Sequence, residues 1–127
     1  FVQEGQDLQV EWDAPTSEVR SEVSLTLNID QHGLSPVVIA CTFPDTGQAT
    51  LPSSLIDALM AFGISGYPNA LVSRRTADSV GIPAGCVDFL VGTPVAPDVE
   101  VSGHYPCTST LDCPGDLTCN LVIQTCQ

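Results

Sequence analysis

The chain has no lysine and little positive charge of any kind. Its three basic residues are Arg20, Arg74 and Arg75, against fifteen acidic residues, so the net charge at pH 7 is −12. A chain with this balance repels nucleic-acid phosphates and anionic lipid surfaces. We therefore expect no nucleic-acid partner, and we expect the scattered acidic residues to form a solvated surface.

Long hydrophobic runs are also missing. The longest apolar stretches, such as residues 55–63, are short and interrupted, whereas a membrane-spanning helix needs about 20 consecutive apolar residues. The content of hydrophobic residues, 43% of the chain, is nevertheless too high for a disordered protein. These features predict a folded protein without a membrane span.

Motifs for catalysis and for cofactor binding are scarce. The sequence contains no Gly-rich phosphate loop, no His-Glu-x-x-His and no EF-hand loop. A Ser-His-Asp set could be assembled from Asp30, His32 and one of many serines, but no Gly-x-Ser-x-Gly elbow accompanies it. We therefore expect no cofactor and no enzymatic activity.

The triplet Asp45-Thr46-Gly47 follows an apolar strand, as the Asp-Thr-Gly triplet of aspartic proteases does. Pro44 directly precedes the aspartate, and Gln48 stands where those enzymes have a small residue. Asp and Gly are also residues that tight turns select. We therefore expect a turn here and no catalytic residue.

Six cysteines are the most informative feature that is present. An even number at orderly spacing predicts disulfides formed in an oxidising compartment, and hence a secreted or cell-surface protein. Cys41 and Cys86 are isolated, whereas the other four lie close together near the end of the sequence: Cys107, Cys113, Cys119 and Cys126.

Alternation of apolar and polar residues predicts strands over residues 8–12, 22–30 and 37–43. Later strands are expected near 70–76 and 86–91, with an edge strand near 99–101. Residues 53–63 break the alternation and place Leu55, Leu59 and Phe62 on one face of a short helix. Ser54 and Asp57 at its start form a potential capping box.

These elements predict an all-β protein, an antiparallel β-sandwich with one short helix and a small disulfide-rich C-terminal tail. Residues 8–15, with the sequence LQVEWDAP, resemble the second strand of fibronectin type III domains, where a core Trp precedes a Pro-bearing turn. In the broader sense the resemblance implies an immunoglobulin-like sandwich over residues 1–104. In this interpretation Cys41 and Cys86 form a disulfide between a middle and a late strand.

The tail, residues 105–127, carries the pattern Cys-x5-Cys-Pro-Gly-x3-Cys-x6-Cys. It is too short for a hydrophobic core, and its cysteine spacing fits disulfides better than zinc ligands. It resembles small Cys-rich repeats of exported proteins of myxobacteria and their relatives, and fragments of the Dickkopf and whey-acidic-protein motifs. Four cysteines permit three pairings. The resemblance implies the crossed one, Cys107–Cys119 with Cys113–Cys126.

Asp112 and Asp116 flank the second cysteine of the tail and are candidate calcium ligands. Two carboxylates are few for a dedicated site, so we expect no bound metal. Tyr67 and Tyr105 each precede a proline, and a binding patch could use them, although local packing on the proline ring is the favoured interpretation. The binding residues are therefore not assigned from the sequence.

The resulting functional hypothesis is a non-catalytic extracellular binding, adhesion or accessory module of an exported bacterial protein, with a protein or a glycan as partner. One alternative is a structural subunit of a surface filament or envelope assembly, which would self-assemble through unpaired edge strands. Another is a protease inhibitor that acts through the Cys-rich tail.

Overall fold

The computed structural model describes residues 1–16, 20–29 and 37–127, so the candidate residues Asp30 and His32 lie outside the described part. The described elements are mostly strands with one short α-helix, which confirms the all-β class. In chain order they are β1 (Leu8–Glu11), β2 (Arg20–Asn28), β3 (Val38–Pro44), β4 (Gln48–Leu51), α1 (Ser53–Met60), β5 (Asn69–Ile82), β6 (Gly85–Val95), the 3₁₀-helix η1 (Thr110–Asp112), β7 (Cys119–Asn120) and β8 (Thr125–Cys126).

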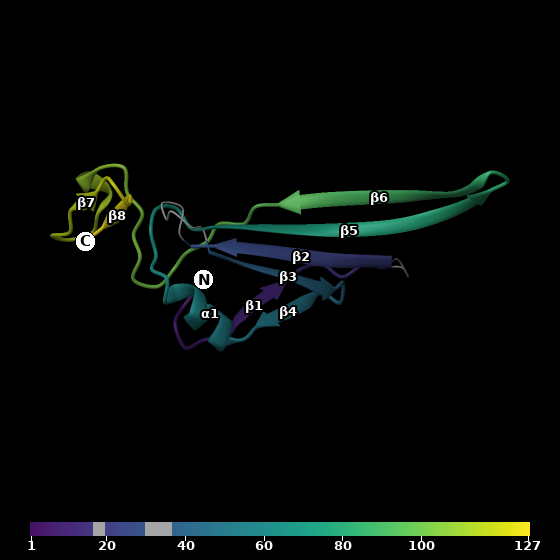
Figure 1. Cartoon of the computed structure of the whole chain (residues 1–127). Coiled ribbons are helices and arrows are strands. Elements are labelled where there is room, and N and C mark those ends of the chain that lie inside the picture. The colour runs from purple at the N-terminus through teal and green to yellow at the C-terminus, as the bar shows by residue number, and fades with distance from the viewer. Residues whose placement is uncertain (17–19, 30–36) are drawn as a thin grey trace.

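The largest sheet has four antiparallel strands in the order β3-β2-β5-β6 (Figure 1). In β2 the predicted alternation is confirmed, because Val23, Leu25 and Leu27 are at most 4% exposed while their neighbours face solvent or are half-buried. Strands with this alternation bury one face only. A second sheet, β1-β4, has two strands, and β7-β8 forms a small ladder in the tail.

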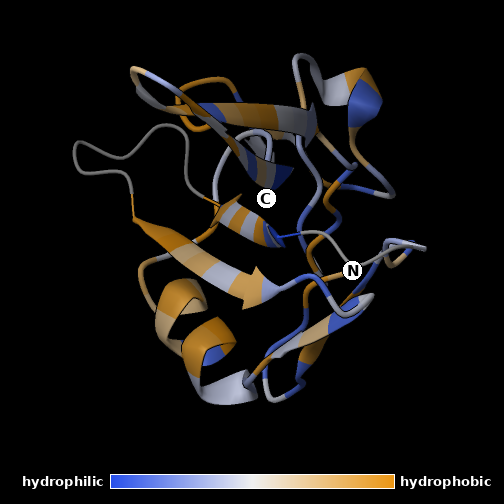
Figure 2. Cartoon of the chain, turned by 90° about the vertical axis from the view of Figure 1, so that its right-hand side faces the viewer, coloured by the Kyte–Doolittle hydropathy of each residue, from blue (hydrophilic) through white to orange (hydrophobic). Residues whose placement is uncertain are grey.

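The core lies between one face of the large sheet and the layer formed by β1, β4 and α1 (Figure 1). Its buried residues come from all these parts: Val2, Leu25, Leu27, Ile29, Leu51, Ile56, Leu59, Ala70 and Val101. Helix α1 contributes mostly apolar side chains and is largely orange in Figure 2. Four strands in one sheet and two in the other do not confirm the immunoglobulin-like sandwich, which has seven or more.

Helix α1 forms where it was predicted, but its buried face differs. It ends at Met60, so Phe62 lies beyond it and is 68% exposed, whereas Ile56 and Leu59 are buried. The predicted capping box is not formed, because Asp57 instead accepts a hydrogen bond of 2.7 Å from the backbone of Gly5. The side chain of Asp57 thus holds the N-terminal segment against the helix.

The edge strand predicted near residues 99–101 is reduced to isolated bridges. Val101 pairs with Val2 in a parallel bridge, closed by hydrogen bonds of 2.8 Å from Val2 to Glu100 and from Ser102 to Val2. Both valines are buried in the core. The first residues of the chain therefore pack beside the segment that leads to the tail.

Strands β5 and β6 are much longer than the sequence predicted. They pair from Val72 opposite Val95 to Ile82 opposite Gly85, and two residues connect them. Gly85 has φ +143°, which suits glycine in a tight hairpin. The described part of β2 begins at Arg20, opposite Ala77, so residues 78–89 continue as a two-stranded arm, which points away from the tail (Figure 1).

The tail contains the disulfides Cys107–Cys119 and Cys113–Cys126, with Cα–Cα distances of 5.9 and 5.6 Å. This is the crossed pairing that the resemblance implied. We call the part of residues 1–104 outside the arm the body. The tail contacts the body at Gly66, whose amide donates a hydrogen bond of 2.8 Å to the carbonyl of Ile123. Among the described residues no helix has the length and hydrophobicity that a membrane crossing requires.

The predicted disulfide between Cys41 and Cys86 is wrong, because both cysteines are free. Cys41 lies in β3, level with Val95 across the sheet, while Cys86 lies nine residues before Val95 on β6. Nine strand residues span about 30 Å, whereas a disulfide needs Cα atoms within about 7 Å. Cys41 instead packs against the core, and Cys86 is exposed near the end of the arm.

Candidate functional site

Asp45, the aspartate of the Asp-Thr-Gly triplet, lies in the turn between β3 and β4, and its side chain is 2% exposed. Its two carboxylate oxygens accept hydrogen bonds of 2.7 Å from Trp12 Nε1 and from Ser21 Oγ. Arg74 on β5 adds an ion pair, with Nε 2.7 Å from Oδ2, and a hydrogen bond of 3.1 Å from Nη2 to Oδ1. The same guanidinium also donates to the carbonyl of Asp13.

These partners set the protonation of Asp45. Burial acts to raise its pKa, but the hydrogen bonds from Ser21, Arg74 and Trp12 and the charge of Arg74 outweigh burial and lower the pKa from its ordinary 3.8. The carboxylate is therefore ionised at neutral pH. It links the turn between β3 and β4 to β2, to β5 and to Trp12, the residue that follows β1.

Gly47 completes this turn and requires a left-handed conformation, with φ +94°. Its carbonyl accepts a hydrogen bond of 2.9 Å from the amide of Trp12. A Cβ at this position would lie 3.3 Å from both the carbonyl oxygen of Trp12 and the Cβ of Ala14. The predicted turn is confirmed. Both carboxylate oxygens of Asp45 accept hydrogen bonds from neighbouring segments, so the side chain has a structural role in holding the turn in place.

Asp112, one of the two calcium candidates, holds the start of η1. Its Oδ2 accepts hydrogen bonds of 2.8 to 2.9 Å from the amide and hydroxyl of Thr108 and from the amide of Ser109. These bonds, the backbone one from Thr108 first, lower the pKa of Asp112. Asp116 is exposed. The geometry thus assigns Asp112 a capping role, and the expectation that these two carboxylates hold no metal stays a prediction.

One cluster in the described part of the chain brings three potential metal ligands together, at Cys107, Cys113 and Cys119. All three sulfurs are in disulfides, so none is a free thiolate that could bind zinc. His104, which precedes this cluster, contacts the carbonyl of Gly66 through Nε2 at 2.8 Å. It therefore helps to hold the tail on the body.

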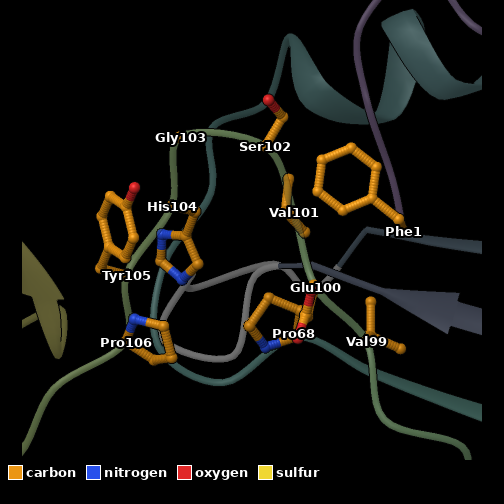
Figure 3. Close-up of a pocket in the computed structure, with 10 residues that line it drawn as sticks. All are labelled: Phe1, Pro68, Val99, Glu100, Val101, Ser102, Gly103, His104, Tyr105 and Pro106. Atoms are coloured by element: carbon orange, nitrogen blue, oxygen red, sulfur yellow. The ribbon is translucent and has the colours of Figure 1, made fainter.

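A hollow of about 600 Å³ lies where the body meets the tail (Figure 3). It is lined by Phe1, by Pro68 and by residues 99–106, and Figure 3 shows the ring of Tyr105 next to His104. Tyr105 is 48% exposed, so its ring is not fully packed on a proline. The structure thus brings Pro68, Tyr105 and Pro106 together, whereas Tyr67 does not line the hollow.

An exposed apolar surface lies on β5 and β6. Side chains alternate between faces along a strand, and Ala70 and Val72 of β5 belong to the core face. The same face continues along the hairpin as an apolar stripe whose side chains are 39% to 61% exposed. The stripe consists of Val80, Ile82, Val87, Phe89, Val91 and Val95.

The opposite face of the hairpin is mostly polar, with Ser73, Arg75, Ser79 and Asp88 among its residues. Arg75 lies 3.6 Å from Glu22, and both side chains are at least half exposed, so this ion pair contributes little. A hairpin with one polar and one apolar face normally rests on a core or on a partner. Here the apolar stripe extends past the body and is uncovered within the described protein.

A second hollow, of about 200 Å³, lies at the base of the stripe. Its walls are Trp12 and Arg74 on the body side and Thr93 and Val95 on β6, with Val23 and Val72 also lining it. Val95 is 61% exposed here. The uncovered surface of β6 therefore leads directly into a depression beside the Asp45 turn.

Comparison of the chain with protein-family models, with curated proteins and with solved structures finds no match. The functional argument therefore rests on the geometry of the chain itself.

Sequence reasoning missed this surface because it placed residues 86–91 in a sandwich core. The apolar alternation of Val87, Phe89 and Val91 predicts a strand with one buried face. The pattern does not distinguish a face buried in the protein's own core from a face that another molecule covers. One signal was available. The run from Gly85 to Gly92 contains a single charge, Asp88, and no proline, which is unusual for an exposed edge strand.

Proposed function

We propose that this protein is a non-catalytic extracellular binding module of an exported protein, and that the hairpin arm is its binding element. The single observation that carries the proposal is the apolar stripe on the hairpin of β5 and β6. Four of its six residues, Val80, Ile82, Val87 and Phe89, lie on the arm beyond the body, and all eleven residues of β6 are exposed. None of the six stripe residues belongs to the buried core or to the partly buried side chains packed against it. Their exposure is explained if another molecule covers them.

The extracellular setting is supported by the two disulfides of the tail. Such bonds persist in oxidising compartments and are reduced in the cytosol. They stabilise a segment of about twenty residues that has no core of its own. The arm and the tail lie at opposite ends of the body, so the arm is free to contact a partner (Figure 1).

A binding module rather than an enzyme is supported by the polar cluster around Asp45. Asp45 has both oxygens occupied by protein donors, so it has no free lone pair directed at a substrate. On the arm, the face that carries the stripe contains one ionisable residue, Asp78, which lies opposite Phe89. Surfaces of this composition gain affinity from buried aromatic and aliphatic anchors, and Phe89 is the largest anchor present.

The experiment compares the chain with a shortened variant on arrays of secreted proteins and of glycans. Residues 78–89 are replaced by Asn-Gly, which joins the paired residues Ala77 and Leu90 through a two-residue hairpin turn. We expect binding by the intact chain and at least a tenfold loss in the variant, with unchanged circular dichroism per remaining residue.

Two results would contradict the proposal. Full binding by the shortened variant would show that the arm is not the binding element. Hydrolysis of peptides or glycans by the purified chain, abolished by a single substitution, would show that the protein is an enzyme.

A further inference from the structure

Strand β6 forms one edge of the large sheet, and its outer backbone groups are not paired within the described protein. Edge strands are commonly protected by lysine, by proline, by bulges or by a covering segment. Here β6 has eleven exposed residues, one charged side chain and no lysine. Pro94, near its inner end, is the one protective residue of this kind on β6, and it removes a single backbone donor from the edge.

We propose that two copies of this chain pair along β6, antiparallel, about a two-fold axis that passes at Leu90. A two-fold axis perpendicular to the sheet leaves the core-side faces of the two copies on the same side of the joined sheet. Odd-numbered residues of β6 therefore stand opposite odd-numbered residues, and even opposite even. The result is a continuous eight-stranded sheet with the two arms side by side. This inference concerns the strand edge and does not depend on whether the apolar stripe binds a further molecule.

The register follows from overlap and from side-chain pairing. Centring the axis at Leu90 places Gly85 opposite Val95 of the other copy, so all eleven positions pair. Phe89 then faces Val91, an aromatic and β-branched combination that stabilises antiparallel strands. Asp88 faces Gly92, so the charges of the two copies are not directly opposed.

The same register explains two further features. Leu90, 68% exposed, lies on the polar face and would contact Leu90 of the other copy. Val87 of one copy would lie opposite Thr93 of the other, beside the hollow formed by Trp12, Arg74 and Val95. The apolar end of each arm thus reaches the depression at the base of its partner's β6.

A second copy is favoured over an unrelated strand because β6 complements itself in this register. One two-fold contact pairs the β6 edges of both copies, so neither β6 edge is left exposed. Pairing of eleven residues provides roughly eight to ten backbone hydrogen bonds, because Pro94 of each copy has no N–H to donate; this number is within the range of a typical interface. The paired edge is about 35 Å long and about 10 Å high, less area than a standard interface buries on each partner. We therefore expect a weak dimer, with a Kd on the order of 10 µM.

The acidic charge of the chain opposes association but does not prevent it. The arm itself carries two charged residues, Asp78 and Asp88, and the antiparallel arrangement places the two bodies at opposite ends. At physiological ionic strength charges further apart than about 8 Å are largely screened. Dimerisation should therefore strengthen as the salt concentration rises.

The first test uses Cys86, which is exposed, as a site for a spin label in a Cys41→Ala background. In the proposed register Cys86 stands opposite Pro94 of the other copy, and eight residues separate the two labelled positions along the strands. Their backbones would be about 27 Å apart. Double electron–electron resonance on the full chain at 200 µM should show a separation near this value, and sedimentation equilibrium should show a dimer.

The second test exploits the fact that Leu90 faces itself. Leu90→Glu places two like charges in contact, and we expect at least a tenfold weaker dimer. Leu71→Glu is the matched control, because Leu71 is on the same face, is 48% exposed and lies on β5 away from the edge. Leu90→Lys should also be monomeric, and a mixture of the Glu and Lys variants should form a heterodimer.

Three results would overturn the inference. One is a monomeric wild type at 200 µM in 0.3 M NaCl. The second is a label separation below 15 Å or above 40 Å, which would indicate a different interface. The third is a dimer that Leu90→Glu and Leu71→Glu weaken equally. Circular dichroism of each variant confirms that a loss of association is not a loss of folding.

Discussion

The guanidinium of Arg74 lies 2.7 Å from the carboxylate of Asp45, although 29 positions separate the two residues in the sequence. The pair connects the turn after β3 with the middle of β5, across the intervening strand β2. Trp12 and Ser21 complete the set of donors around the carboxylate. A triplet that resembles a catalytic motif therefore belongs to the framework of the body.

Replacement of Asp45 by Asn should destabilise the body. The substitution removes the negative charge while Arg74 remains in place, and it leaves donors without acceptors in a buried position. Because Arg74 is one-third exposed, we expect a loss of about 2–3 kcal/mol rather than the larger value for a fully buried pair. Urea unfolding measures it, and Asp116→Asn, which removes the same charge from an exposed position, should cost less than about 0.5 kcal/mol.

The contribution of Asp45 should also depend on pH. Its pKa is lower in the folded state than the ordinary 3.8 of the unfolded chain, so the stabilisation is fully present above that value. It is lost as the pH falls from 3.8 through the lowered folded pKa. The difference in unfolding free energy between wild type and Asp45→Asn should therefore be constant from pH 7 to 5 and shrink below pH 4. A difference that grew towards low pH would contradict this assignment.

Gly47→Ala should be more harmful than its size suggests. The left-handed φ of +94° and two contacts of 3.3 Å both oppose a Cβ at this position. We expect a loss of about 1–3 kcal/mol, measured by thermal unfolding. Gly81→Ala is the control, because a Cβ there meets nothing within 4 Å. Equal effects of the two substitutions would show that the turn is not constrained as described.

Removal of both tail disulfides should unfold the tail and spare the body. Each bond closes a loop of 12 or 13 residues, a constraint worth about 3 kcal/mol in the chain-entropy model. A variant with all four tail cysteines replaced by serine should lose residues 105–127 rapidly to proteases. Mass spectrometry of the resistant fragment should then show an intact body, whereas digestion of both parts would mean that the body depends on the tail.

Local patterns predicted those parts of the fold that depend on neighbouring residues. The alternation along β2 and β3 identified both strands, and the spacing of apolar residues after Pro52 identified α1. The crossed disulfides followed from resemblance to other Cys-rich repeats. The strands and the helix could be predicted because their patterns lie within one short segment. The disulfides could be predicted because similar repeats share the cysteine spacing.

Features that depend on distant residues were not predicted. The sequence gives no sign that Arg74 meets Asp45, because the two residues are far apart in the chain and only strand β2, between them in the sheet, brings them together. The length of the hairpin was missed because Thr76, Ala77, Asp78 and Ser79 interrupt the apolar pattern of β5. Cys86 was assigned to Cys41 on the immunoglobulin-like interpretation, which placed both cysteines in neighbouring parts of a sandwich, whereas β6 carries Cys86 far along the arm.

Trp12 gives the molecule a built-in optical reporter, because it is the one tryptophan in the chain. Its indole is hydrogen-bonded to the ionised Asp45 and also lines the hollow at the base of β6. Its emission should therefore change when the turn after β3 opens and when a second arm settles into that hollow. Reduction of the tail, at the far end of the body, should leave the emission unchanged. A single fluorescence signal can thus separate events at the two ends of the protein.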